Sequence, residues 1–185
     1  MKKYVSRPLS NHDIRYIFLK DIYAKKYFLG NIIAIGNPNI VNIIENIKPP
    51  KFVIINTAGK NKPGLHWVLV FYFKNITIFL DPFGFNPQFY NFLYIHNRKD
   101  VPLLRNTWRG GQQPLAVDSY YCGHYVVLYG LLLSRGIKLE DINNCFTKFP
   151  RINDSIANDI VKWLINRINK KLIKKSKLKL KMMTY

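Results

Sequence analysis

The chain is short of cysteine, of acidic residues and of long apolar runs. Cys122 and Cys145 are the only cysteines among 185 residues, too few for a disulfide framework, and an intracellular compartment would keep both reduced. No apolar run reaches the roughly 18 residues that span a bilayer, and the basic first residues lack the apolar stretch of a signal peptide. We therefore expect a soluble, intracellular protein that is not secreted and contacts no membrane.

Sequence motifs for metals and nucleotides are also missing. No Cys and His spacing suits zinc and no glycine-rich loop suits a nucleotide, so we expect no metal and no small-molecule cofactor. Apolar bulk is plentiful: hydrophobic residues make up 48% of the chain and aromatic residues 15%, which argues against disorder. The length suits one domain, which we place at residues 1–169, followed by a basic tail at residues 170–185.

The shortage of acidic residues leaves a large positive charge. Ten Asp and Glu stand against 29 Lys and Arg, a formal net charge of +19, which favours an acidic partner and most simply nucleic acid. The basic tail supplies the candidate DNA contacts, namely Lys170, Lys171, Lys174, Lys175 and Lys177. A solvated helix end explains the same lysines without a ligand, and the chain is rich enough in Ile and Asn for biased composition to contribute.

The spacing of apolar residues predicts helices and strands. Ser10 followed by Asp13 has the pattern of a capping box ahead of the first helix. We expect helices at about residues 11–23, 40–47, 87–95, 122–134, 138–148 and 154–173, and strands at about 28–35, 51–57, 65–73 and 76–80. The helix at 122–134 is nearly apolar all round, so it should be buried. One apolar stripe on the last helix reads as packing surface: Ile156, Ile160, Trp163, Leu164 and Ile168.

Cys122 stands where a polar loop meets this apolar helix. The positive end of the helix dipole and unpaired backbone amides favour a thiolate at such a position. Cys145 has no polar partners nearby in the sequence, so we interpret it as a buried small hydrophobe. Cys122 is therefore the candidate nucleophile.

A hairpin in the middle of the chain brings a histidine and an acid together. If residues 74–75 form a two-residue turn, His66 and Asp81 occupy diagonal positions on one face, with backbones roughly 7–8 Å apart. The carboxylate can then reach the imidazole. A register slip of one residue would put the two side chains on opposite faces.

Together these residues could form the site of a cysteine protease. His66 would take the proton of the Cys122 thiol and return one to the leaving amine, while Asp81 orients the ring. The side-chain amide of Gln113 and the backbone N–H of Cys122 would donate to the oxyanion. Each residue also has a plainer explanation: a satisfied core histidine, an ordinary Asp-Pro-Phe-Gly turn, and a polar loop.

Several segments closely resemble the adenovirus protease (adenain) family. They are Tyr27 to Gly30, Ile55 to Gly59, Gly64 to Trp67, Asp81 to Phe85, and the Gln ahead of Cys122-Gly123. The wider clan includes the SUMO-specific proteases. The resemblance runs from about residue 11 to residue 136 and implies an α+β fold, with a mixed β-sheet packed between helices and the nucleophile at the N-terminus of a buried central helix.

The resemblance also implies the activity. Family members in adenoviruses, related DNA viruses and virus-like transposons cleave capsid and core precursor proteins next to glycine during particle maturation, and DNA raises their activity. By position, His66, Asp81, Gln113 and Cys122 would be base, acid, oxyanion donor and nucleophile, with Trp67 packed beside them. We expect a monomer in the host nucleus and in the virion, with DNA bound without sequence preference as activator.

Some residues depart from the family pattern. Adenain has Glu where this chain has Asp81, a choice that the SUMO proteases share. Gln113 lies two residues further from the cysteine than in adenain, which leaves Gln112 and Gln113 open as the oxyanion donor. No cysteine precedes Cys122, so activation by a disulfide-linked peptide is not expected here.

Three functions are consistent with the sequence. The first is a viral or virus-like cysteine endopeptidase that acts on capsid and core precursors. The second is a protease for ubiquitin-like proteins such as SUMO. The third is a basic core protein that binds DNA without catalysis, for which the charge alone argues.

Overall fold

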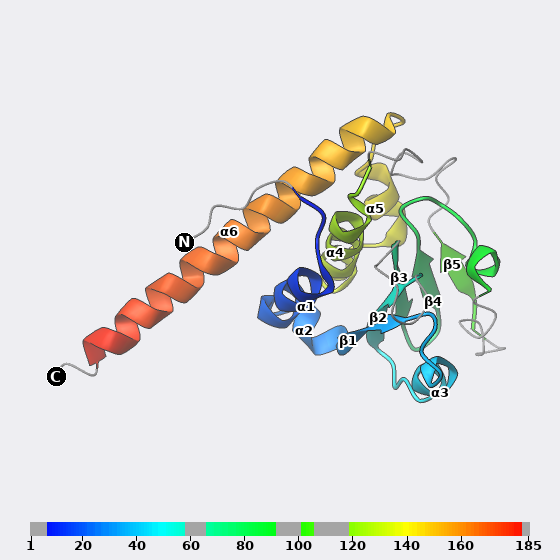
Figure 1. Ribbon diagram of the computed structural model, residues 1–185, viewed down its shortest axis with the longest axis horizontal. Coiled ribbons are helices and arrows are strands. Elements are labelled where there is room, and N and C mark those ends of the chain that lie inside the picture. The colour runs from blue at the N-terminus through cyan, green and yellow to red at the C-terminus, as the bar shows by residue number, and fades with distance from the viewer. Residues whose placement is uncertain (1–6, 58–65, 92–100, 106–118, 183–185) are drawn as a thin grey trace.

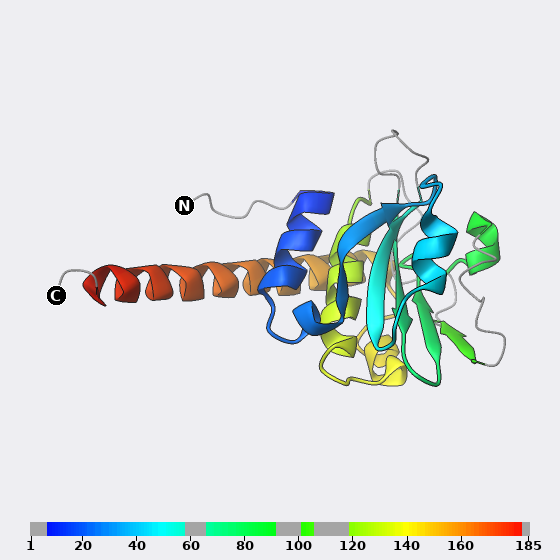
Figure 2. The ribbon, with the colours of Figure 1, turned by 90° about the horizontal axis from the view of Figure 1, so that it is seen from below.

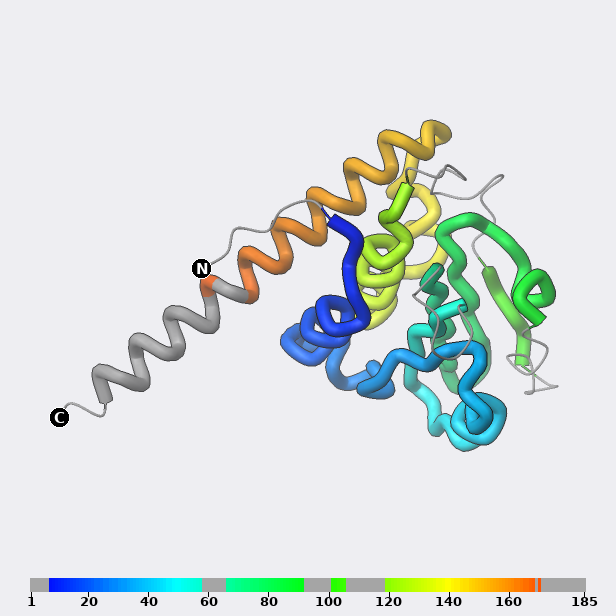
Figure 3. The backbone as a smooth tube through the Cα atoms, in the orientation of Figure 1, coloured from blue at the N-terminus to red at the C-terminus, as the bar shows by residue number. Residues whose placement is uncertain are grey.

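The computed structural model describes residues 7–57, 66–91, 101–105 and 119–182, with side chains in the last helix up to Ile168 and at Lys170. Figure 3 follows the backbone. Gln112 and Gln113 lie outside the described residues. None of the helices in the described ranges is both long and apolar enough to cross a membrane.

The fold is α+β, as predicted, and is built on a mixed five-stranded sheet (Figure 1). The strands stand in the order β1 (Phe28–Ala34), β2 (Lys51–Asn56), β3 (Trp67–Tyr72), β4 (Thr77–Leu80) and β5 (Leu103–Arg105). The two outer pairs, β1 with β2 and β4 with β5, are parallel, and the inner pairs are antiparallel. The short strand β5 was not predicted from the sequence.

Helices cover both faces of this sheet. On one face lie α1 (Asn11–Lys20), α2 (Ala24–Tyr27) and α4 (Cys122–Leu133), followed by α5 (Leu139–Asn144), while α3 (Ile40–Glu45) packs on the other. Residues of β2 and β3 alternate between the two resulting apolar clusters, so both strands are buried along almost their whole length. A strand buried on both faces reads as a continuous apolar run, which is the pattern seen in the sequence.

Most sequence-predicted elements are confirmed, with shifted ends. The capping box of Ser10 and Asp13 is present at α1, and α4 is buried as expected. In place of the helix predicted at residues 87–95 there is a 3₁₀ helix, η1 (Pro87–Tyr90), which ends at Asn91 because that residue has a left-handed backbone (φ 57°), and residues 92–95 lie outside the described residues. The helix α2 was not predicted, since it is a single turn.

The last helix, α6 (Pro150–Met182), is longer than predicted and projects from the body of the protein (Figure 2). Its N-terminal half packs on α4 through Ala157 and Val161. The predicted stripe is wrong in part: Trp163 is 55% exposed, because the helix face that meets α4 is centred on these two small residues. The backbone continues as helix through residue 170, so the division into a domain of residues 1–169 and a basic tail stays a prediction.

Cys145 also differs from its prediction, because it is exposed rather than buried. It follows directly after α5, a helix that turns Ile142 and, just beyond its end, Phe146 towards the core. Residues four apart in a helical turn lie on the same face, so Ile142 and Phe146 both face the core. Cys145 lies on a different face, which is exposed to solvent.

Candidate active site

The β3–β4 hairpin forms in the predicted register. The backbone N–H of Phe73 donates to Ile76, which closes the two-residue turn, and regular pairing ends at Leu69 and Leu80. His66 directly precedes β3 and Asp81 directly follows β4, so both lie at the same end of the hairpin. Their side chains meet: His66 Nε2 lies 2.6 Å from Asp81 Oδ1.

The carboxylate of Asp81 is completely buried and held from several sides. Besides His66, it accepts hydrogen bonds from the backbone N–H groups of Phe83 (2.9 Å) and Phe85 (3.0 Å) and from the hydroxyl of Tyr90 (2.8 Å). The turn that follows β4 thus wraps around the acid. A carboxylate fixed in this way can hold an imidazole ring in one orientation and one tautomer.

The imidazole of His66 is clamped between this acid and aromatic rings. It stacks on Phe83, with centroids 4.1 Å apart and planes at 12°, and Tyr90 lies 6.2 Å away. The backbone carbonyl of His66 accepts a hydrogen bond from Thr57. Because Nε2 is engaged by Asp81, the other ring nitrogen, Nδ1, is the one available to a nucleophile.

Cys122 begins α4 and reaches this ring from the neighbouring layer. The Cys122 side chain is buried. It is one of the groups that raise the pKa of His66, which requires the thiol to lie beside the imidazole. Within the described residues, however, Nδ1 of His66 has no partner that meets hydrogen-bond geometry, so the thiol and the ring adjoin without a well-formed bond. Hydrogen bonds between catalytic groups are often long in structures without a bound substrate.

Close packing sets the position of the N-terminal end of α4. Gly123 directly follows the cysteine, and a side chain there would meet the Cβ atom of Leu9 at 3.0 Å. Glycine therefore lets the start of the helix approach the N-terminal segment. The helix in turn lies on β3, the strand that His66 precedes. This packing brings together residues that are 56 positions apart in the sequence.

Burial and neighbouring groups shift the pKa of His66 in opposite directions. Burial alone would lower its pKa, but Asp81, through its hydrogen bond and its charge, and the adjoining Cys122 together outweigh burial and raise the pKa to about 9. The ring is consequently a cation at neutral pH. An imidazolium next to a cysteine side chain can give a proton to a leaving group.

Loss of this charge should weaken the fold at high pH. The pKa of His66 is near 6.5 in the unfolded chain and about 9 in the folded protein, so its stabilising effect is complete below pH 6.5 and is lost as the pH rises through 9. Urea denaturation at successive pH values should show the stability difference between wild type and His66→Gln shrinking across this window. A difference independent of pH would contradict the raised pKa.

A second set of contacts anchors the segment that leads into Cys122. Asp154 of α6 accepts hydrogen bonds from the hydroxyls of Ser119 (2.8 Å) and Tyr125 (3.0 Å). Ser119 lies three residues before the cysteine and Tyr125 three residues after it. The carboxylate is buried and thereby ties both sides of the nucleophile to α6.

Asp154→Ala should cost about 1–3 kcal/mol of unfolding free energy, because the buried Tyr125 hydroxyl loses its acceptor. It should also slow alkylation of Cys122 in protein that remains folded, while Asp154→Asn restores part of the rate. Asp159→Ala, at an exposed position of the same helix, is the matched control. Urea denaturation and the rate of iodoacetamide labelling of Cys122 report the two effects, with all variants made in a Cys145→Ser background because Cys145 is exposed. Equal labelling rates in Asp154→Ala and the control would show that Asp154 does not position the cysteine.

The structure describes the side chains of only some of the remaining predicted residues. Trp67 is buried beside His66, donates its Nε1–H to Asn11 at 2.9 Å and lines a cavity of about 440 Å³. Lys170 is exposed, whereas the side chains of Lys171, Lys174, Lys175 and Lys177 lie outside the described residues. The assigned roles of all these residues stay predictions.

The sequence-based prediction missed Tyr90 and Asp154. A signal existed for Tyr90, because Pro87 predicted a helical turn shortly after Asp81. No local pattern points to Asp154, which lies 35 residues from Ser119. Within the described parts of the chain, no group of three or more His, Cys, Asp or Glu side chains is arranged to hold a metal ion.

Of three comparisons with known proteins, only the search of solved structures gives a match. No protein-family model matches the chain, and a search of curated proteins finds no match either. Among solved structures, the SUMO protease Ulp1 with its catalytic cysteine oxidised to a sulfinic acid is similar at 18% identity and a TM-score of 0.47. The match covers 88% of this chain and 79% of the other. At this identity and TM-score the similarity by itself indicates no function.

Proposed function

We propose that this protein is a cysteine endopeptidase with Cys122 as nucleophile, His66 as base and Asp81 as the orienting acid. One observation carries the proposal: a buried imidazole is held by a carboxylate at 2.6 Å and has its free ring nitrogen next to a cysteine that begins a buried helix. Nucleophile, base and orienting group in this order define a catalytic triad. The arrangement needs no metal ion for peptide hydrolysis.

The chemistry follows from the two ring contacts. Transfer of the thiol proton to Nδ1 of His66 gives a thiolate beside an imidazolium, which is the charged ring described above, and the sulfur attacks the carbonyl carbon of the scissile bond. The ring then gives that proton to the departing amine, and a thioester to Cys122 forms. Water, deprotonated by the same ring, releases the carboxylic acid and restores the thiol. The backbone N–H of Cys122 and Gln113, or Gln112, would donate to the oxyanion.

A thiol-reactive electrophile tests the nucleophile without any knowledge of the substrate. Because Cys145 is exposed and would react as well, the assay should use a Cys145→Ser background. We expect rapid modification of Cys122 at neutral pH, measured by mass spectrometry, and much slower modification in His66→Ala. Equal rates with and without His66 would overturn the proposed activation and favour a basic DNA-binding protein that is not an enzyme.

The proposed substrates are capsid and core precursor proteins of a virus or virus-like element, cleaved next to glycine. This part rests on the sequence resemblance to adenain. A ubiquitin-like protein such as SUMO is the second candidate, favoured by Asp81, the acid that the SUMO proteases use. Incubation of the purified protein with precursor proteins and, separately, with SUMO conjugates would separate the two. Cleavage of the conjugates alone would exclude the viral substrate.

DNA is the proposed activator and acts through the basic tail. The geometry of α6 suits this role, since its C-terminal half extends beyond the body and carries exposed Lys170 (Figure 2). Bound phosphates would release counterions without sequence preference.

Truncation after Ile168 should weaken binding to unrelated DNA duplexes. It should also reduce the slope of the logarithm of the binding constant against the logarithm of the salt concentration, by about 0.9 for each phosphate that the tail would otherwise neutralise. Cys122 labelling should persist, since the triad lies outside the tail. Replacement of Lys174 and Lys175 by Gln keeps the helix and tests charge alone. Titrations from low to moderate salt measure both quantities. A salt-independent affinity would contradict a role for the tail.

A further inference from the structure

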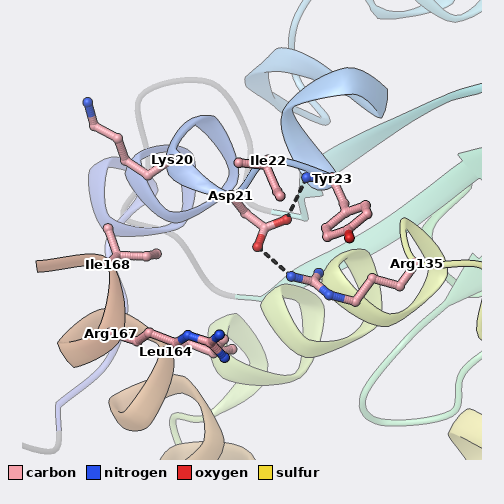
Figure 4. A pocket seen from close by; sticks show the side chains of 8 residues that line it. All are labelled: Lys20, Asp21, Ile22, Tyr23, Arg135, Leu164, Arg167 and Ile168. Carbon is pink, nitrogen blue, oxygen red and sulfur yellow. Dashed lines mark hydrogen bonds and ion pairs between the residues drawn. The ribbon is translucent and has the colours of Figure 1, made fainter. Parts of the chain in front are cut away.

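A pocket lies at the other end of α4 from the candidate active site. It has a volume of about 370 Å³ and is enclosed by the end of α1 and the turn after it, by the residue two positions past α4, and by α6 (Figure 4). Its lining residues are Lys20, Asp21, Ile22, Tyr23, Arg135, Leu164, Arg167 and Ile168. The 12 residues of α4 separate it from Cys122 by about 18 Å.

The guanidinium of Arg135 is fixed in the wall of this pocket. It donates to Asp21 at 2.6 Å and to the carbonyl of Leu131 at 2.9 Å, and it lies over the ring of Tyr23 with 4.8 Å to the centroid. An arginine carries five N–H donors, so further donors remain for a ligand. A donor already held in place loses little entropy when it binds an anion.

The charge of the pocket is unbalanced. Asp21 is the only acid in the lining, and its carboxylate is already engaged by Arg135 and by the backbone N–H groups of Tyr23 and Ala24. Lys20 and Arg167 make no ion pair within the described residues. The lining residues thus carry a net charge of +2, with the Lys20 ammonium over the ring of Tyr16 and Arg167 over the ring of Trp163. This charge favours an acidic occupant.

The apolar part of the lining indicates what kind of anion fits. Ile22 is 57% exposed, and it lines the pocket with the partly buried Leu164 and Ile168, a surface that suits aliphatic side chains. Single-stranded nucleic acid would instead use aromatic faces for stacking. The nearby Tyr23 and Trp163 each already have an arginine over the ring, at 4.8 Å and 5.1 Å.

We propose that this pocket is a docking site for an acidic segment of a protein substrate that also carries aliphatic side chains. The statement that the segment belongs to a substrate rests on the proposed peptidase function. An extended chain needs at least about six residues to cover this distance, and more to follow the surface around the buried helix α4, so docking and cleavage can occur on one polypeptide. The pocket would then raise the local concentration of the scissile bond at the triad.

Direct binding tests the site without cleavage. The full-length Cys122→Ala protein is titrated into a short fluorescein-labelled peptide of alternating Glu and Leu, with fluorescence anisotropy as readout. Lys20→Gln combined with Arg167→Gln should weaken binding by about tenfold. Lys138→Gln removes the same kind of charge at an exposed position outside the pocket and should leave binding unchanged. All variants keep the basic tail, so its contribution cancels, and circular dichroism checks that each is folded.

Two matched probes complete the experiment: a Gln and Leu peptide of the same length and a short oligothymidylate. The proposal expects weak binding of the neutral peptide and oligothymidylate binding that does not depend on Lys20 and Arg167. Equal binding of the acidic peptide by wild type and the double variant would overturn it, as would a dependence on these two residues for oligothymidylate alone. Labelling of Cys122 is independent of this result, so failure of the docking site and failure of the peptidase proposal are distinguishable.

Discussion

Replacing Cys122 with alanine should abolish cleavage, lowering the turnover of a glycine-containing peptide library by roughly 10⁴-fold or more. The reason is that no other described thiol adjoins a base: Cys145 is exposed and lies beyond α5, away from the β3–β4 hairpin that carries His66 and Asp81. Release of peptide products, followed by mass spectrometry with purified variants, measures the effect.

Cys145→Ala is the matched control for this substitution. It removes a thiol of the same kind from an exposed position and should leave most of the activity intact. Loss of activity in Cys145→Ala with retention in Cys122→Ala would mean that the nucleophile is assigned to the wrong residue.

Loss of the His66 ring should be about as damaging as loss of the sulfur. Among the described residues, His66 alone of the histidines contacts a carboxylate, that of Asp81 at 2.6 Å, and it is the proposed base. His66→Ala therefore removes the group that deprotonates the thiol. Residues that act as one catalytic unit are not additive. The double variant with Cys122→Ala should therefore cleave no more slowly than either single variant, measured by turnover of the same peptides. A double variant far slower than both singles would indicate separate catalytic contributions.

The sequence by itself predicted the local geometry of the acid and base. A two-residue turn determines the register of the β3–β4 hairpin, and this register puts His66 and Asp81 at one end of it. The burial of α4 followed in the same way, because a helix that is apolar all round has no face for water. These features depend on residues close together in the chain.

Only the tertiary structure decided how these parts meet. The approach of Cys122 to His66 depends on the packing of α4 on β3, and the two hydroxyls bound by Asp154 depend on where α6 lies. The exposure of Trp163 and the pocket beside Arg135 likewise result from the position of α6. Local sequence sets backbone dihedrals and side-chain periodicity, whereas contacts across 30 or more residues are selected by the close packing of whole elements.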